Sequence, residues 1–139
     1  MKMSRRDLAL LAPAMLATAA KAEKTPMPGH AWPFEDLPVK VNGENNSRNV
    51  FDGVTHSGFA IDMHITELAP GKAPHPPHHH EHEEMIMIQE GTVEVTIDGK
   101  VTRLGPGGLA YVASNQEHGW RNAGTTRANY FVLAMGKKV

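Results

Sequence analysis

Short segments in which apolar and polar residues alternate, separated by turn residues, dominate the chain from Val50 onward. Side chains two apart on a β-strand point to the same side, so this period predicts half-buried strands. The segment 59–68 is the clearest case: its apolar residues fall on one face and its polar residues on the other, namely Phe59, Ile61, Met63 and Ile65 against Asp62, His64 and Thr66. Asp98-Gly99 predicts a tight hairpin turn between two further strands. We therefore expect an all-β chain of seven or eight short strands, folded as a sandwich or a jelly-roll barrel.

The length and the composition limit what this fold can contain. A chain of 139 residues suffices for one compact domain with its own core. The absence of cysteine excludes disulfides, thiolate metal sites and cysteine nucleophiles. Residues 23–49 are rich in proline, glycine and asparagine and lack sustained periodicity, so we interpret them as an arm laid over a barrel domain at residues 50–139.

The first 22 residues have the features of an export signal. Arg5 and Arg6 make a basic start before an apolar stretch of 13 residues, which as a helix of about 20 Å is too short for a hydrocarbon core of about 30 Å. "SRRDLAL" is typical of a twin-arginine signal, and an ordinary secretory signal is the alternative. We expect a periplasmic or secreted protein. Its mature chain, with a formal charge of −4, has no electrostatic reason to bind nucleic acid or anionic membrane.

Five of the nine histidines lie in one tract, "HPPHHHEH", at residues 75–82. If this tract is a strand, His78 and His80 point to the same side, and Glu84 opens a strand that returns beside them. His118 is the only downstream histidine. Three imidazoles and one carboxylate suit manganese, iron, nickel or zinc, whereas structural zinc sites usually contain thiolates. The alternative is a surface tract that binds metals nonspecifically.

The residues of this tract resemble the first motif of the cupin family. Gly71, His78, His80, Glu84 and Gly91 match it, with Gly71 one residue farther from His78 than the commonest spacing. The run 107–122 resembles the second motif through Gly107, His118 and Asn122. Two positions depart from the family pattern, because Ala113 stands where proline is usual and Asn115 where glycine is usual. Asparagine is the next best residue at a left-handed backbone position.

The resemblance implies a single jelly-roll β-barrel with one divalent ion held inside by His78, His80, Glu84 and His118. It also implies turn positions at Gly71, Gly91 and Gly107, and a structural role for Asn122 in closing a turn. Cupins are frequently homodimers. Met85 and Met87 support a homodimer independently, because a strand that is apolar on both faces needs cover on both. Cover by the arm at residues 23–49 is the alternative.

Several other residues are weaker candidates for the site. Asp62 and His64 share a strand face and form either an acid/base pair or an exposed pair. His75 and His82 flank the ligands as groups that support the metal or the substrate, whereas His79 is expected to face solvent. Four residues are candidate acids or bases beside the metal: His64, His82, Glu83 and Tyr111. Trp120 and Tyr111 either wall a pocket or pack in the core.

The complete ligand set favours a metal-dependent enzyme of the oxygenase, isomerase or lyase type that acts on a small oxygenated molecule. Glu84 would be its catalytic residue, supplying negative charge and accepting a proton. Manganese or iron is favoured if the chain folds before twin-arginine export, because zinc and copper outcompete these ions outside the cytoplasm. Zinc and nickel also suit the donors. The alternative is a periplasmic module that binds a small ligand or a metal without turnover, and that binds several ions through His75, His79 and His82.

Overall fold

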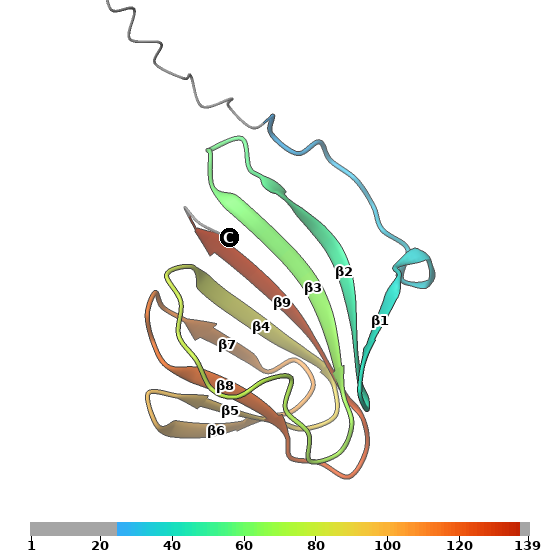
Figure 1. The fold of residues 1–139 in the computed structure, drawn as a ribbon, viewed down its shortest axis with the longest axis vertical. Helices are drawn as coiled ribbons and strands as arrows, with labels where there is room; N and C mark the ends of the chain where they lie inside the picture. The colour runs from blue at the N-terminus through green and yellow to red at the C-terminus, as the bar shows by residue number, and fades with distance from the viewer. Residues whose placement is uncertain (1–24, 137–139) are drawn as a thin grey trace, which may run out of the picture.

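The computed structural model describes residues 25–136, and the expected export signal at residues 1–22 lies outside the described residues. Nine strands and one short 3-10 helix make up the described chain (Figure 1). Their bounds are η1 Phe34–Asp36, β1 Val39–Asn42, β2 Asn45–Val54, β3 Ala60–Leu68, β4 Glu83–Glu90, β5 Val93–Ile97, β6 Lys100–Leu104, β7 Leu109–Val112, β8 His118–Asn122 and β9 Ala128–Gly136. Within these residues, no helix is long and apolar enough to cross a membrane.

Two antiparallel sheets face each other (Figure 1). The larger sheet has the strand order β1-β2-β3-β9-β4-β7, and the smaller sheet has the order β6-β5-β8. An apolar core of mostly aliphatic side chains packs between them: Leu68, Ile86, Ile88, Val93, Val95, Val112, Trp120, Ala128, Tyr130 and Val132. This arrangement confirms the predicted all-β jelly-roll fold.

The alternation in the sequence places side chains on the predicted faces. On β4, Ile86 and Ile88 are each 1% exposed, whereas Met85 and Met87 on the opposite phase are 37% and 45% exposed. The hairpin turn predicted between β5 and β6 lies at Asp98-Gly99, and both residues have positive φ angles of 47° and 78°. The period of two therefore predicts strand positions, but not always the inner face: on β3 the polar residues Asp62 and His64 face the barrel interior, and the apolar residues on the opposite phase face outward.

The prediction that the histidine tract forms a strand is wrong. Residues 69–82 form a loop that makes a single antiparallel bridge, between His78 and His118. Prolines at positions 74, 76 and 77 lack the N–H groups that a ladder needs, which explains the loop. Glu84 lies in β4, between β9 and β7, and does not pair with the histidine segment.

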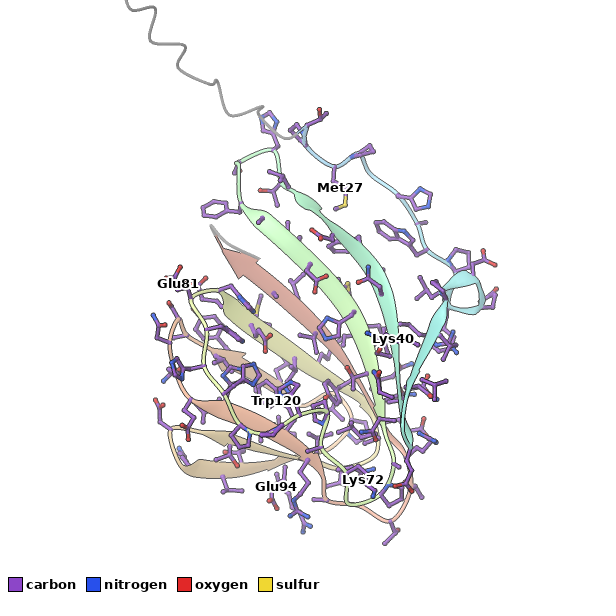
Figure 2. All side chains as sticks on the ribbon, viewed as in Figure 1. Met27, Lys40, Lys72, Glu81, Glu94 and Trp120 are labelled. Atoms are coloured by element: carbon purple, nitrogen blue, oxygen red, sulfur yellow. The ribbon has the colours of Figure 1, made fainter. Side chains whose placement is uncertain are left out.

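The N-terminal segment is partly regular. The domain boundary predicted at residue 50 falls inside β2, which is continuous from Asn45 to Val54 and pairs with β1 and β3. The arm before β1 runs beside β2, where the Met27 amide donates to the Val54 carbonyl at 2.8 Å (Figure 2). Farther along the arm, the Trp32 ring lies 5.1 Å from the Phe51 ring of β2. The exposure of Met85 and Met87 shows that the arm does not cover them, which corrects that alternative.

The motif glycines occupy turns, as predicted. Gly71, Gly91 and Gly107 have φ angles of 74°, 79° and 81°. Gly91 has a second reason to lack a side chain, because a Cβ atom there would lie 2.7 Å from the Arg127 carbonyl oxygen. Asn115, where the family pattern has glycine, adopts φ 63°, a left-handed conformation that asparagine tolerates.

Candidate metal centre

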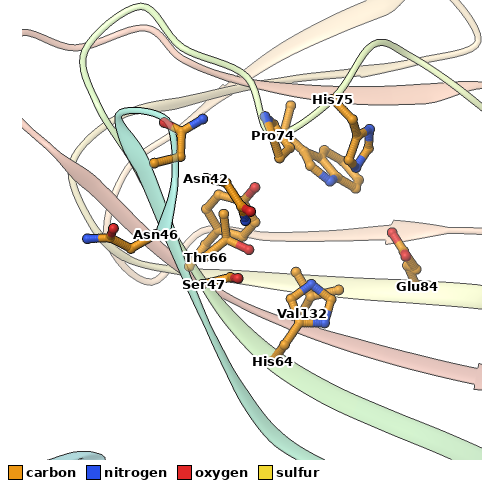
Figure 3. A pocket seen from close by; sticks show the side chains of 12 residues that line it. Asn42, Asn46, Ser47, His64, Thr66, Pro74, His75, Glu84 and Val132 are labelled. Carbon is orange, nitrogen blue, oxygen red and sulfur yellow. The ribbon is translucent and has the colours of Figure 1, made fainter. Parts of the chain in front are cut away.

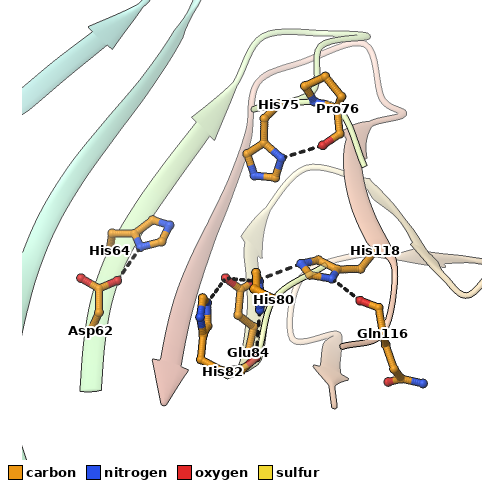
Figure 4. Close-up of polar contacts among 9 residues, drawn as sticks. All are labelled: Asp62, His64, His75, Pro76, His80, His82, Glu84, Gln116 and His118. Atoms are coloured by element: carbon orange, nitrogen blue, oxygen red, sulfur yellow. Dashed lines mark hydrogen bonds and ion pairs between the residues drawn. The ribbon is translucent and has the colours of Figure 1, made fainter. Parts of the chain in front are cut away.

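Two histidines, His80 and His118, present buried and unpaired nitrogens to one point inside the barrel. The Nδ1 atom of His80 lies 2.9 Å from the His82 carbonyl oxygen, and the Nδ1 atom of His118 lies 2.8 Å from the Gln116 carbonyl oxygen (Figure 4). A carbonyl only accepts, so both Nδ1 atoms carry a proton, and in the neutral imidazole each Nε2 atom then carries the lone pair. These Nε2 atoms are buried and have no hydrogen-bond partner.

Glu84 faces both of these nitrogens from β4. Its Oε1 atom lies 3.3 Å from His80 Nε2, and its Oε2 atom lies 3.5 Å from His118 Nε2. Lone pairs facing a carboxylate at this range repel it unless a cation lies between them. Imidazole nitrogens and a carboxylate oxygen are ligands that divalent transition ions accept, so the donors fit the ion that the fold family implies.

His78 joins the cluster through the backbone. Its amide donates to the His118 carbonyl at 3.0 Å and its carbonyl accepts from the His118 amide at 2.8 Å. This bridge holds the two motif segments together across 40 residues of sequence, with the two rings 4.6 Å apart. Burial lowers the pKa of the His78 imidazole below its usual value, and the neighbouring His75 and His118 rings lower it further. The neutral form, which binds metals, is thereby favoured.

Among the residues that the structure describes, two groups of donors could hold a metal ion, because all ligand atoms of each group lie within 4.8 Å of one another. The first is His78, His80 and His118, and the second is His80, His82 and Glu84. They share His80, and neither contains both His78 and Glu84. The exposed His75 and His79 belong to neither group. A shared ligand favours one ion per chain over the several ions that a metal buffer would bind.

A pocket of about 240 Å³ opens beside Glu84 (Figure 3). Most of its lining residues have polar side chains, and they come from β1 to β4, β8, β9 and the histidine loop: Asn42, Asn45, Asn46, Ser47, His64, Thr66, Pro74, His75, Glu84, Trp120, Tyr130 and Val132. None of these residues is a lysine or an arginine. The lining therefore carries no permanent positive charge of its own.

The β1–β2 hairpin supplies four of these residues, and sequence reasoning missed them. The segment was interpreted as part of an arm because it lacks long periodicity, although Asn42-Gly43 is a hairpin signal. Contacts at the turn hold the hairpin against the histidine loop: Asn45 Nδ2 donates to the Ala73 carbonyl at 3.1 Å, and Lys72 Nζ lies 2.6 Å from Glu44 Oε2. The hairpin thus closes one side of the pocket.

His64 and Asp62 form a half-buried pair on the inner face of β3. His64 Nδ1 lies 3.1 Å from Asp62 Oδ1, and the side chains are 35% and 23% exposed (Figure 4). A carboxylate accepts, so Nδ1 carries the proton and Nε2 carries the lone pair. His64 lines the pocket together with Glu84, and the pair is half-buried rather than fully exposed.

Three further residues singled out from the sequence differ in burial: Trp120 and Asn122 are buried, whereas Tyr111 is exposed. Trp120 is 4% exposed and does both things expected of it, packing in the core and lining the pocket. Tyr111 is 56% exposed on the outer face and does not line the pocket beside Glu84, although it lines two other surface pockets. Asn122 is fully buried and closes a turn as expected. Its Nδ2 atom donates to the Leu68 and Thr126 carbonyls at 2.9 and 2.7 Å, and its Oδ1 atom accepts from the Gly124 amide at 2.9 Å.

Comparison with known proteins identifies this architecture. Residues 64–134, which carry both histidine motifs, match the family model described as a cupin domain. The chain belongs to the cupin family. This cupin is similar to the dimethylsulfoniopropionate lyase DddW of Ruegeria pomeroyi, with 30% identity over 99 residues that cover 68% of this chain. It spans 64% of the length of that lyase, which is less than two thirds.

Solved structures resemble this cupin in fold at lower identity. An RmlC-like cupin from Shewanella frigidimarina aligns with a TM-score of 0.64 and 18% identity over 81% of this chain and 93% of the other. KdgF from Halomonas sp. aligns with a TM-score of 0.66 and 17% identity over 77% of this chain and 94% of the other. The β1–β2 hairpin lies before the part that the family model matches, so four pocket residues are contributed from outside it.

Proposed function

We propose that this cupin is a metal-dependent enzyme of the lyase or isomerase type that acts on a small carboxylate. The observation that carries the proposal is the pair of buried, unpaired Nε2 atoms of His80 and His118 facing Glu84. His78, His80, Glu84 and His118 would hold one divalent ion. When bound, the ion supplies Lewis acidity that polarises an oxygen of the substrate. The similarity to a lyase supports this class of reaction.

The charge of the pocket supports a monocarboxylate as the substrate. Glu84 is the only carboxylate among the residues that line the pocket, and no lysine or arginine lines it; Asp62 lies behind His64, outside the lining. A divalent ion held at Glu84 would leave one net positive charge on this lining. A single carboxylate on the substrate neutralises that charge, whereas a dianion leaves an uncompensated charge in a partly buried site. The hairpin amides and Ser47 offer hydrogen bonds to the rest of the molecule.

His64 is placed to move a proton. With Nδ1 held by Asp62, its Nε2 atom accepts a proton from the carbon next to the substrate carboxylate. In a lyase the electron pair of that C–H bond becomes the new double bond, and the group on the adjacent carbon leaves with its own bonding pair. In an isomerase the same proton returns to a different position. Asp62 keeps the His64 ring oriented and stabilises its protonated form.

The test combines metal content with turnover. The untagged full chain, purified with its native metal, is analysed for elements and incubated with dimethylsulfoniopropionate and other propionates that carry a leaving group on the β-carbon. We expect one ion per chain and new vinyl protons in the proton NMR spectrum. A chain that binds no ion, or that binds one ion but neither binds nor converts any carboxylate of the set, contradicts the proposal.

Two finer points belong to the same proposal. We propose that the ion is manganese or iron and that the protein works in the periplasm or outside the cell, because the sequence begins with a twin-arginine-like segment. Protein recovered from the periplasm of its host should then contain manganese or iron. Zinc or copper alone in that protein contradicts the assignment of the metal. Full retention of the chain in the cytoplasm contradicts export.

A further inference from the structure

His82 lies between two of the metal ligands in the sequence and contacts both of them in space. Its backbone carbonyl accepts the Nδ1–H bond of His80 at 2.9 Å. This bond selects the tautomer of His80 and aims its Nε2 lone pair at Glu84. The contact comes from the backbone, so any residue at position 82 makes it if the loop keeps its shape.

The His82 side chain adds two contacts, which the backbone of another residue at position 82 would not make. Its ring stacks on the His80 ring with 3.5 Å between centroids and 9° between planes. Its Nε2 atom lies 3.4 Å from Oε1 of Glu84. A carboxylate only accepts, so His82 is the donor in this long hydrogen bond. One side chain therefore restrains the ring of one ligand and the carboxylate of another.

The stacking geometry separates the roles of the two histidines. The lone pair of an imidazole nitrogen lies in the plane of its ring. The two ring planes are nearly parallel with centroids 3.5 Å apart, so the in-plane lone pairs of His80 and His82 do not converge on one point. The donor atoms of His80, His82 and Glu84 do lie within 4.8 Å of one another. The orientation of the rings nevertheless favours His80 as the ligand and His82 as its support.

Gly136 at the end of β9 provides the space that His82 occupies. A Cβ atom at position 136 would lie 3.2 Å from both the Cα and the Cβ atoms of His82, closer than ordinary van der Waals contact. The strand that passes beside β4 therefore limits where the histidine loop can sit. A side chain added at position 136 would displace His82 without altering any residue of the histidine tract.

We propose that His82 is a positioning residue that sets the geometry of the metal centre through His80 and Glu84. Gly136 packs against His82 and leaves room for it because it has no side chain. This inference rests on the proposed function, because it requires an ion at that centre. Support of this kind for metal ligands is typically worth about 10- to 100-fold in metal affinity. The effect is therefore measurable from metal binding alone, without knowledge of the substrate.

The experiment titrates Co²⁺ into the untagged, metal-free full chain and records the visible absorption of the bound ion. His82→Phe keeps a ring for stacking and removes the donor, whereas His82→Gln keeps a donor. His79→Ala is the matched control, because His79 is exposed, lies in the same loop and belongs to neither donor group. We expect one ion per chain throughout, an affinity about 10- to 100-fold lower with a shifted spectrum in His82→Phe, and partial recovery in His82→Gln.

The outcomes separate the inference from the proposed function. If His82→Phe matches His79→Ala in affinity and spectrum, the positioning role is wrong although the metal centre stands. If X-ray absorption shows that His82→Phe has one nitrogen ligand fewer than the wild type, His82 is itself a ligand and the positioning role is again wrong. No cobalt bound by the wild type overturns both. Gly136→Ala provides a second variant outside the loop, and we expect a smaller change in the same direction.

Discussion

Asp62 of β3 and Glu84 of β4 lie in one row on the inner face of the larger sheet, because both are paired with Ala134 of β9. Two strand spacings put their Cα atoms about 10 Å apart. Residues that are directly paired across strands project from the same face, so Asp62 and Glu84 both point into the barrel interior. Ala134 of β9 lies between them.

This separation predicts that the His64–Asp62 pair affects turnover without affecting metal content. His64→Gln removes the group that accepts the proton, and we expect turnover to fall by about 100- to 10,000-fold, the usual contribution of a general base. Asp62→Asn should have a smaller effect in the same direction. Elemental analysis and turnover are measured on the same preparations. Loss of the ion in His64→Gln would place His64 among the ligands and refute this division of roles.

Removal of a buried ligand should release the ion. His118 is 1% exposed, and its Nε2 atom has no other partner. We expect His118→Ala to lose more metal affinity than the about 100-fold upper range for residues that only support ligands. His79→Ala should keep its ion, because His79 is exposed. Equal metal loss in both variants, measured by elemental analysis after dialysis, would mean that the tract binds as a surface cluster.

Asn122 should contribute strongly to stability. Asn122→Ala leaves the Leu68 and Thr126 carbonyls and the Gly124 amide without their side-chain partner. We expect a loss of about 2 to 4 kcal/mol in the free energy of unfolding, measured with urea. Arg121→Ala is the control on the same strand. Its ion pair with Glu94 lies at the surface, with 50% of the Arg121 side chain exposed, so the loss there should stay below about 1 kcal/mol. Similar losses in the two variants would argue against the turn-closing role.

We predict that the outer face of β4 and β7 is the interface of a homodimer. Four apolar side chains are exposed there in two directly paired rows: Met85 with Tyr111, and Met87 with Leu109. Met87→Glu should weaken the dimer at least tenfold, because an unpaired carboxylate is costly to bury. Val101→Glu on β6, which alters an exposed residue of the other sheet, should not weaken it. Sedimentation velocity measures both, and a wild type that is monomeric at micromolar concentration contradicts the prediction.

Tyr130 should make stability fall in alkaline solution. Burial raises the pKa of its phenol above the ordinary value of 10.0, and a hydrogen bond with Thr66 only partly opposes this. Because the folded state holds the proton more tightly, this contribution to stability is complete below about pH 10 and is lost as the pH rises further. One such proton corresponds to about 1.4 kcal/mol per pH unit. Tyr130→Phe should reduce this slope in urea unfolding between pH 9 and 11.

The exposed Tyr111 supplies the control for this measurement. Tyr111→Phe, compared with Tyr130→Phe in the Met87→Glu background that should weaken the dimer, should leave the alkaline slope unchanged, because Tyr111 is 56% exposed in the single chain. If Tyr130→Phe and Tyr111→Phe give the same slope, burial of the Tyr130 phenol is not the cause of the loss of stability.

The sequence by itself determined the strands, the tight turns and the motif residues. These depend on local chemistry: a period of two for strand faces, left-handed backbone at Gly91 and Asn115, and imidazoles at His78 and His80. Prolines also act locally, and they explain why the histidine tract forms a loop where a strand was expected. The motif spacing was enough to assign the cupin fold, because family motifs record a tertiary arrangement that local rules do not contain.

Only the tertiary structure decided what surrounds those residues. Three contacts join segments that are far apart in the sequence. They are the bridge between His78 and His118, the packing of His82 against Gly136, and the closure of the pocket by the β1–β2 hairpin. Local periodicity carries no information about which strands pair or in which register. Strand register is set by burial of the whole inner face, so the position of His64 opposite the metal ligands follows from packing across three strands.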